Sequence, residues 1–248
     1  MSAQPKPSPF EPILPALATT LSWSGLHGSS RALALARAGA VHPGLVLALV
    51  PDSQTALHLQ AELELFASPA IPVDLFPDWE TLPYDVFSPH QDIISQRLAT
   101  LYRLPQRRQG ILVVPAATLV QRLSPRAYLD GHALLLEKGQ GLDLDDFRSR
   151  LEAAGYSYVS QVTEHGEFTV RGSLVDLFPM GAELPYRIDL LDEDVDTIRT
   201  FDTDSQRSID KVERVELLPA REFSLTRESI TRFRHSYRAR FAGDPQQS

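Results

Sequence analysis

The chain has 248 residues, enough for one large domain or two unequal ones, and its formal net charge is −8. The acidic balance argues against free-standing DNA binding, because non-specific affinity for nucleic acids depends on attraction to phosphates. No cysteine is present, which excludes disulfides, thiolate zinc sites and cysteine nucleophiles.

The N-terminal region shows no export signal. Residues 1–12 are proline-rich and are expected to form a disordered tail, and the apolar stretch 13–21 is interrupted by Pro15. The most apolar run, residues 44–50, has the length of a buried strand and is much too short to span a membrane. We therefore expect a cytoplasmic protein with no membrane partner.

Residues 13–125 alternate between predicted strands and helices. Strong helix formers at 29–38 predict a helix that ends at Gly39. The run LVLALV is apolar on both faces, like a central parallel strand. The remaining elements are a helix at 56–66, a strand at 73–76, a helix at 92–104 and a strand at 111–114. This order predicts an α/β domain with a parallel sheet covered by helices.

Beyond residue 125 short strands are predicted, with one helix at 145–154 among them. The strands are expected at 132–136, 156–162, 168–171, 174–178, 186–191 and 197–201. Turn-forming residues between them suit antiparallel hairpins, so we expect a smaller α+β domain at 126–216, inserted into the first. Residues 217–248, with an arginine-rich helix at 226–241, would begin a return to the first domain, whose closing segments are expected to be missing.

A glycine-containing loop, Gly25-Leu26-His27-Gly28-Ser29-Ser30, occupies the place of a nucleotide-binding P-loop. A P-loop needs a lysine for the outer phosphates, and Ser29 stands at that position. No lysine occurs between Lys6 and Lys138, so no other residue of the first domain supplies this charge. We interpret Gly25, Gly28, Ser29 and Ser30 as a degenerate loop that binds no nucleotide.

Other potential sites have structural explanations. The acidic run 192–194 separates two predicted hairpin strands and should be a solvated turn. His90 and His165 lack the paired spacing of metal ligands, and no metal, cofactor or catalytic residue is predicted. The aromatic residues of the first domain have no accompanying basic patch, so we expect packing in the interior instead of base stacking. They are Trp79, Tyr84 and Phe87.

Two segments are more specific than the rest: DWETLPYDVFSPHQDIISQRLATLYRL at 78–104 and EHGEFTVRGSLVDLFPMGAELPYRIDLLDEDVDTIRTF at 164–201. Together they resemble the amino-terminal module of bacterial transcription-repair coupling factors, which is similar to the repair subunit UvrB. The resemblance extends over residues 13–241. It implies a helicase-like, P-loop-derived first domain without a nucleotide site, and a second domain that binds UvrA.

The resemblance also implies what this chain lacks. UvrB inserts a long aromatic hairpin that grips damaged DNA, whereas here Phe87 is followed almost directly by the helix predicted from residue 92. In the family, RNA polymerase and DNA are reached through later domains, and a carboxy-terminal domain of the parent protein covers the UvrA-docking surface. The chain is therefore expected to be a fragment.

Alternation along the strand 186–191 places Arg187 and Leu191 on one face and Ile188 and Leu190 on the other. Arg171 ends a neighbouring strand. Arginine beside an apolar anchor on a rigid sheet is typical of interface hot spots. By their position in the motifs, the residues that match the family's UvrA contacts are Arg171, Arg187 and Leu191. Leu191 replaces the phenylalanine common there, so the apolar contact is smaller.

From the residues alone, Arg187 could instead form an ion pair with Asp189 or Glu167. The interface interpretation requires that the guanidinium groups are not buried in pairs within their own domain. The sequence thus predicts a non-catalytic adaptor that binds UvrA and recruits nucleotide excision repair to stalled RNA polymerase. The alternatives are a degenerate helicase-family ATPase half, which would bind ATP, and a structural brace for the translocase, which would bind neither ATP nor UvrA.

Overall fold

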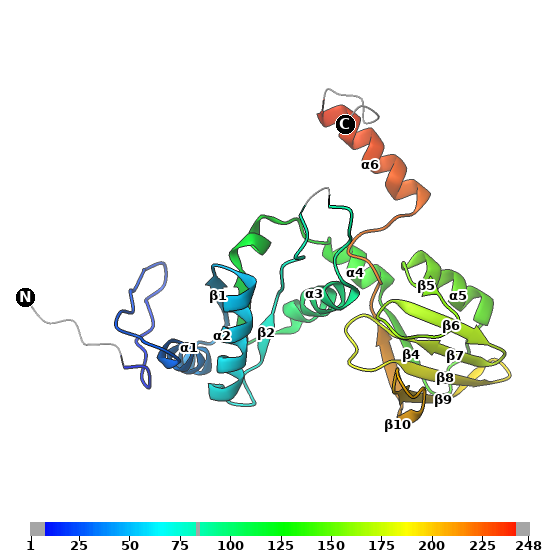
Figure 1. Ribbon diagram of the computed structural model, residues 1–248, viewed down its shortest axis with the longest axis horizontal. Helices are drawn as coiled ribbons and strands as arrows, with labels where there is room; N and C mark the ends of the chain where they lie inside the picture. Colours follow the sequence, from blue (N-terminus) through cyan, green and yellow to red (C-terminus); the bar gives the residue numbers. More distant parts are fainter. Residues whose placement is uncertain (1–7, 83–84, 242–248) are drawn as a thin grey trace, which may run out of the picture. The chain divides into compact units, whose positions relative to one another are not determined.

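The computed structural model describes residues 8–82 and 85–241. The chain divides into two compact units, one ending at Arg122 and one starting at Leu123, and each is described by itself (Figure 1). Residues 1–7 of the expected tail, Tyr84, and residues 242–248 of the C-terminal segment lie outside the described residues. Within these limits, no helix combines the length and the apolar character needed to cross a membrane.

The first unit is built on a parallel sheet with the strand order β1-β3-β2. Its elements are α1 (Ser30–Val41), β1 (Leu45–Val50), α2 (Ser53–Phe66), β2 (Val73–Leu75), α3 (Gln91–Arg103), β3 (Gly110–Pro115) and the 3-10 turns η1 (Leu104–Gln106) and η2 (Ala116–Val120). Side chains of α1 and α2, including Ala32 and Leu63, pack with Ile111 on one face of the sheet. On the other face, Leu112 packs with Leu101 of α3. The predicted parallel sheet with helices on its faces is confirmed, but β1 is an edge strand that exposes part of one face, and not the central strand that its apolar run indicated.

Helix α1 does not end at Gly39, and this detail of the prediction is wrong. Gly39 is buried inside the helix, which continues to Val41. A Cβ atom at Gly39 would lie 2.8 Å from Cγ1 of Ile111 on β3. The glycine is therefore needed for the close approach of helix and sheet, and not for a left-handed helix end.

The buried Arg97 of α3 fixes the start of the loop that follows β2. Its guanidinium group lies 4.4 Å from the ring centroid of Phe76 and 4.8 Å from that of Trp79. Its Nη1 atom also donates a hydrogen bond of 2.6 Å to the carbonyl oxygen of Pro77. Trp79 thus packs, as predicted. Phe87 is 81% exposed, so the expectation that it packs is wrong.

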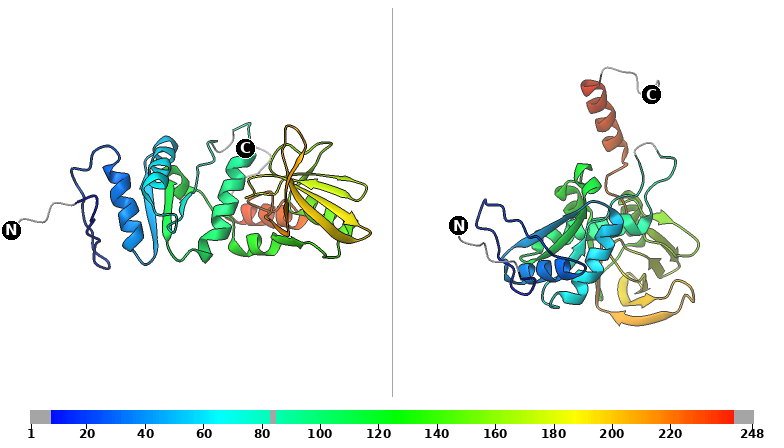
Figure 2. Two further views of the ribbon diagram at one scale, coloured as in Figure 1. Left: turned by 90° about the horizontal axis from the view of Figure 1, so that it is seen from below. Right: turned by 60° about the vertical axis from the view of Figure 1, so that its left-hand side comes forward.

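The second unit contains a six-stranded sheet with the order β10-β9-β8-β7-β6-β5, antiparallel except between β5 and β6. Its strands are labelled in Figure 1 and coloured from yellow-green to orange in Figure 2. Its strands are β5 (Ser157–Tyr158), β6 (Glu167–Arg171), β7 (Leu174–Leu177), β8 (Tyr186–Leu191), β9 (Asp194–Phe201) and β10 (Ser208–Val212). A second, two-stranded sheet pairs β4 (Leu134–Glu137) with β11 (Arg214–Leu217). The helices are α4 (Arg126–His132), α5 (Leu144–Ala153) and α6 (Arg227–Arg240).

The predicted hairpins, the helix around 145–154 and the arginine-rich helix are confirmed in this unit. The acidic run 192–194 includes the turn between β8 and β9, as expected. Three elements were not predicted: α4, β10 and β11. Helix α4 is short and contains Gly131, and the side chains of β10 are almost all exposed, so neither carries a strong apolar period.

Alternation along the strands gives the six-stranded sheet two unlike faces. One face is apolar, and its cross-strand row of Val175, Ile188 and Ile198 is fully buried. The opposite face is called the polar face below. It consists of two cross-strand rows: Thr169, Asp176, Arg187, Arg199 and Lys211, and next to them Arg171, Leu174, Asp189 and Thr197.

Candidate protein-interaction face

Two arginines of the polar face share one buried carboxylate. The side chain of Asp176 on β7 is 1% exposed. Its Oδ1 atom accepts a hydrogen bond of 2.7 Å from Nε of Arg187. Its Oδ2 atom accepts bonds of 2.9 Å from Nη2 of Arg187 and 2.5 Å from Nη2 of Arg171. Because two guanidinium groups meet one carboxylate, this cluster of three side chains carries one uncompensated positive charge.

Arg187 is the inner member of the pair. Its side chain is only 16% exposed, and its Nη1 atom donates a further hydrogen bond of 3.1 Å to the carbonyl oxygen of Gln206. The guanidinium group also lies 4.8 Å from the ring centroid of Phe201. The hydrogen bonds to Asp176 raise the pKa of Arg187 above its ordinary value, against the opposing effect of burial. The prediction of an accessible guanidinium group is therefore wrong for Arg187.

The intramolecular ion pair of Arg187 is real, but its partner is neither of the two expected acids. Asp176 faces Arg187 directly across the β7–β8 ladder. Asp189 instead pairs with Arg199 and accepts a hydrogen bond from Thr197. Glu167 is engaged by backbone N–H groups of the preceding loop. Strand register, which is invisible in the sequence, selects the partner.

Arg171 and Leu191 remain accessible at one end of the sheet. The side chain of Arg171 is 51% exposed, and Leu191 is 68% exposed. The backbone N–H of Leu190 donates to the carbonyl oxygen of Ser173, which brings the end of β8 beside the turn that follows Arg171. An arginine and an apolar side chain are thus presented together on a rigid sheet, the combination that recurs in protein interfaces.

The two rows of the polar face are positive although the whole chain is acidic. Its two rows contain four cations, Arg171, Arg187, Arg199 and Lys211, and two carboxylates, which leaves a charge of +2. The full chain has a formal charge of −8. Glu167 on β6 and Asp194, opposite Leu191, add two carboxylates at the margins of the same face, so the positive excess is confined to the rows around Asp176. A local excess of this kind favours a carboxylate of the partner beside Arg171. Asp176 and Arg199 were not predicted as site residues. The only signal for Asp176 was an acid among the apolar residues of β7.

The loop before α1 places a carboxylate where a phosphate-binding loop would need a cation. Gly25 and Gly28 both have positive φ angles, +75° and +55°. Oγ of Ser29 donates a hydrogen bond of 2.6 Å to Oε1 of Glu62. Oγ of Ser30 bonds to the backbone of its own loop, and no β-strand precedes the loop within residues 8–24. A phosphate at this loop would meet the negative charge of Glu62.

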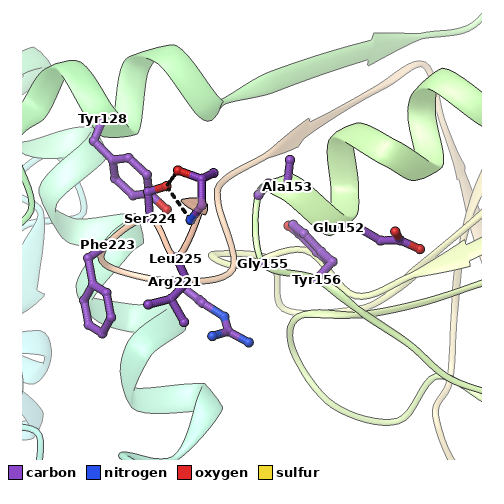
Figure 3. A pocket seen from close by; sticks show the side chains of 11 residues that line it. Tyr128, Glu152, Ala153, Gly155, Tyr156, Arg221, Phe223, Ser224 and Leu225 are labelled. Carbon is purple, nitrogen blue, oxygen red and sulfur yellow. Dashed lines mark hydrogen bonds between the residues drawn. The ribbon is translucent and has the colours of Figure 1, made fainter. Parts of the chain in front are cut away.

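A pocket of about 230 Å³ occupies another part of the second unit (Figure 3). It is lined by Tyr128 of α4, by residues 152–156 at the end of α5, and by Arg221 and residues 223–226. Burial raises the pKa of Tyr128, and the charge of Arg221 acts in the opposite direction. None of these residues belongs to the polar face, so the pocket is a separate feature.

The strands that carry the polar face fall within a known family. Residues 134–223 match the family model of the UvrB interaction domain. The match begins with β4 and ends after β11, so the UvrB interaction domain includes the complete six-stranded sheet and both accessible residues, Arg171 and Leu191.

The similarity to known proteins extends over most of the chain and is not limited to residues 134–223. The similar proteins are transcription-repair-coupling factors. It is 50% identical over 216 residues to the protein of Escherichia coli K12. The matched region is 87% of this chain and 19% of the relative. The protein of Haemophilus influenzae is 48% identical over 210 residues (85% and 18%), and that of Staphylococcus aureus USA300 is 32% identical over 166 residues (67% and 14%). The chain thus spans less than a fifth of these curated relatives. The resemblance predicted from the two sequence segments is confirmed.

Proposed function

We propose that this chain is a non-catalytic adaptor whose UvrB interaction domain binds UvrA through the polar face. The observation that carries the proposal is the exposed pair of Arg171 and Leu191 beside a cluster with one uncompensated positive charge. An interface needs an anchor of this kind on a rigid support. The names of the similar proteins support a role in coupling transcription to repair, which here means bringing nucleotide excision repair to stalled RNA polymerase.

In this proposal the first unit does not hydrolyse nucleotides. Its parallel sheet and its glycine loop before α1 are compatible with descent from a helicase-like P-loop domain. The Ser29–Glu62 hydrogen bond is unfavourable for phosphate binding. Residues 13–125 would then be the degenerate domain, 126–216 the UvrA-binding domain and 217–248 the segment that returns to the first. RNA polymerase, DNA and the carboxy-terminal domain would be engaged through other parts of the parent protein.

The decisive experiment is a binding titration of the purified chain with UvrA. Arg171→Ala should weaken binding by on the order of 2 kcal/mol, because it removes an exposed interface anchor. Arg150→Ala is the matched control, since Arg150 is 54% exposed and makes a loose ion pair with Asp146 at 3.8 Å on helix α5. If the unmodified chain showed no binding to UvrA, or if both variants bound equally well, the proposed interface would be wrong.

A further inference from the structure

Asp176 is a buried carboxylate between two arginines of the polar face, Arg171 and Arg187. Both oxygens of the Asp176 carboxylate are occupied by guanidinium groups of its own domain, and the side chain is 1% exposed. Asp176 cannot contact a partner directly. A buried carboxylate nevertheless fixes the positions of the arginine side chains that it binds, because charge-assisted hydrogen bonds in the interior are short and directional.

The two arginines are held in different ways. Arg187 uses Nε and Nη2 on Asp176 and Nη1 on the carbonyl oxygen of Gln206, so three of its five N–H groups are engaged. Arg171 donates a single hydrogen bond, from Nη2 to Asp176, among the described residues. Its remaining N–H groups lie on a half-exposed side chain. Arg171 is thus tethered at one nitrogen and can still donate hydrogen bonds to a carboxylate of another protein.

The charge of the cluster also favours a carboxylate as the ligand of Arg171. The carboxylate of Asp176 neutralises one of the two guanidinium groups, and nothing in the cluster neutralises the other. Leu191 lies at the same end of the sheet and is 68% exposed. A partner side chain that complements both features is an aspartate or glutamate next to an apolar depression.

We propose that Asp176 is a positioning residue for partner binding: it locks Arg187 into the sheet and holds Arg171 in the pose that receives a carboxylate of the partner. This inference rests on the proposed function, since the partner is taken to be UvrA. Arg171 and Leu191 make the contacts.

A double-mutant cycle with purified UvrA tests the inference. The variants are Asp176→Asn, Arg171→Ala and the combination of both, each shown by thermal unfolding to be folded at the assay temperature. Each single change should weaken binding by about tenfold or more, and the double variant should bind within about twofold of Arg171→Ala. Adding Asp176→Asn to Arg171→Ala should weaken binding little further, because both changes remove the same contact.

Salt dependence supplies a readout that a purely structural role of Asp176 would not move. Binding of the unmodified chain should weaken as salt is raised, and Arg171→Ala should show a shallower dependence because the intermolecular ion pair is lost. Asp176→Asn raises the formal charge of the cluster from +1 to +2. A dependence as shallow as that of Arg171→Ala is nevertheless expected, because the contact that Asp176 positions is lost; a steeper dependence would show that only the net charge matters. If Asp176→Asn does not fold, Asp176→Glu serves instead, since it keeps the charge but displaces the carboxylate by one methylene. It should again have no effect in the Arg171→Ala background.

The outcomes separate the two proposals. Independent, multiplicative losses in the double variant would show that Asp176 does not act through Arg171, and would overturn this inference while UvrA binding stands. Unchanged binding of Arg171→Ala by a chain that binds UvrA would overturn it as well. Failure of the unmodified chain to bind UvrA would overturn the proposed function and this inference together.

Discussion

Arg187 lies directly opposite Asp176 in the β7–β8 ladder and is joined to it by two hydrogen bonds of 2.7 and 2.9 Å. Removing the guanidinium group would leave a buried carboxylate with Arg171 as its remaining ionic partner. We expect Arg187→Ala to lower the free energy of unfolding of the second unit by about 3 kcal/mol, near the low end for a broken buried pair because Arg171 remains.

Urea unfolding followed by circular dichroism measures this effect. The exposed Arg150→Ala should change the free energy of unfolding by less than about 0.5 kcal/mol. A similarly small change for Arg187→Ala would contradict the structural role assigned to Arg187. Binding measurements on Arg187 variants need this correction, because loss of folded protein reduces apparent affinity.

Enlarging the apolar side chain at position 191 should strengthen binding to UvrA. Leu191 is 68% exposed at the end of β8, where related proteins of the family are expected to carry phenylalanine. Leu191→Phe should improve affinity by up to about 1 kcal/mol and Leu191→Ala should reduce it by about 1 kcal/mol or more, following the apolar area available for burial. Titration with UvrA measures both. Equal affinities for the two variants would exclude Leu191 from the interface.

Alkaline unfolding should report on Tyr156. This residue is buried, its hydroxyl group donates a 2.7 Å hydrogen bond to the carbonyl oxygen of Leu218, and burial raises its pKa well above the ordinary value near 10. Because the folded state retains the proton, stability is fully present below about pH 10 and declines above it as the unfolded chain ionises.

Tyr156→Phe should therefore be less stable than the unmodified chain at neutral pH and lose less stability on going to high pH. The neutral-pH cost is about 1 to 3 kcal/mol, since the carbonyl oxygen of Leu218 loses its partner in the interior. Urea titrations at pH 8, 9, 10 and 11 would reveal the change of slope. Parallel pH profiles for the two proteins would rule out Tyr156 as the group that titrates.

Two helical glycines should respond in opposite directions to replacement by alanine. A Cβ at Gly39 would lie 2.8 Å from Ile111, whereas a Cβ at Gly131 in α4 would meet nothing within 4 Å. Gly39→Ala should destabilise the first unit by about 1 to 3 kcal/mol through overpacking. Gly131→Ala should stabilise the second by up to about 1 kcal/mol through helix propensity. Thermal unfolding measures both, and combining Gly39→Ala with Ile111→Val should recover part of the loss.

Restoring the missing P-loop lysine should not restore nucleotide binding. In Ser29→Lys the new ammonium group would lie near Glu62, whose carboxylate now accepts the Ser29 hydrogen bond at 2.6 Å. Isothermal titration with ATP and Mg²⁺ should show no saturable binding for either protein. Saturable binding by the unmodified chain would favour the rival interpretation as a degenerate ATPase. Binding by Ser29→Lys alone would show that a single charge was the missing element.

Much of the fold could be predicted because its signals are local. The run of apolar residues in β1 and the amphipathic pattern at 56–66 predict a strand followed by a helix, and in the structure Asp52 caps α2 by accepting a hydrogen bond from the N–H of Thr55. Elements with weak periodicity, such as β10, were missed. The predicted helix end at Gly39 is wrong because a glycine in a helical pattern can mark either the end of the helix or a close packing contact, and the sequence does not distinguish them.

By itself, the sequence determined which side chains share a face of β8, since alternation along a strand is a property of the chain. It therefore placed Arg187 and Leu191 together and apart from Ile188. Only the tertiary structure decided that Arg187 is buried against Asp176 while Arg171 stays half-exposed. The reason is physical: ion pairing and burial depend on the register between strands that are separated along the chain, and local composition does not encode that register.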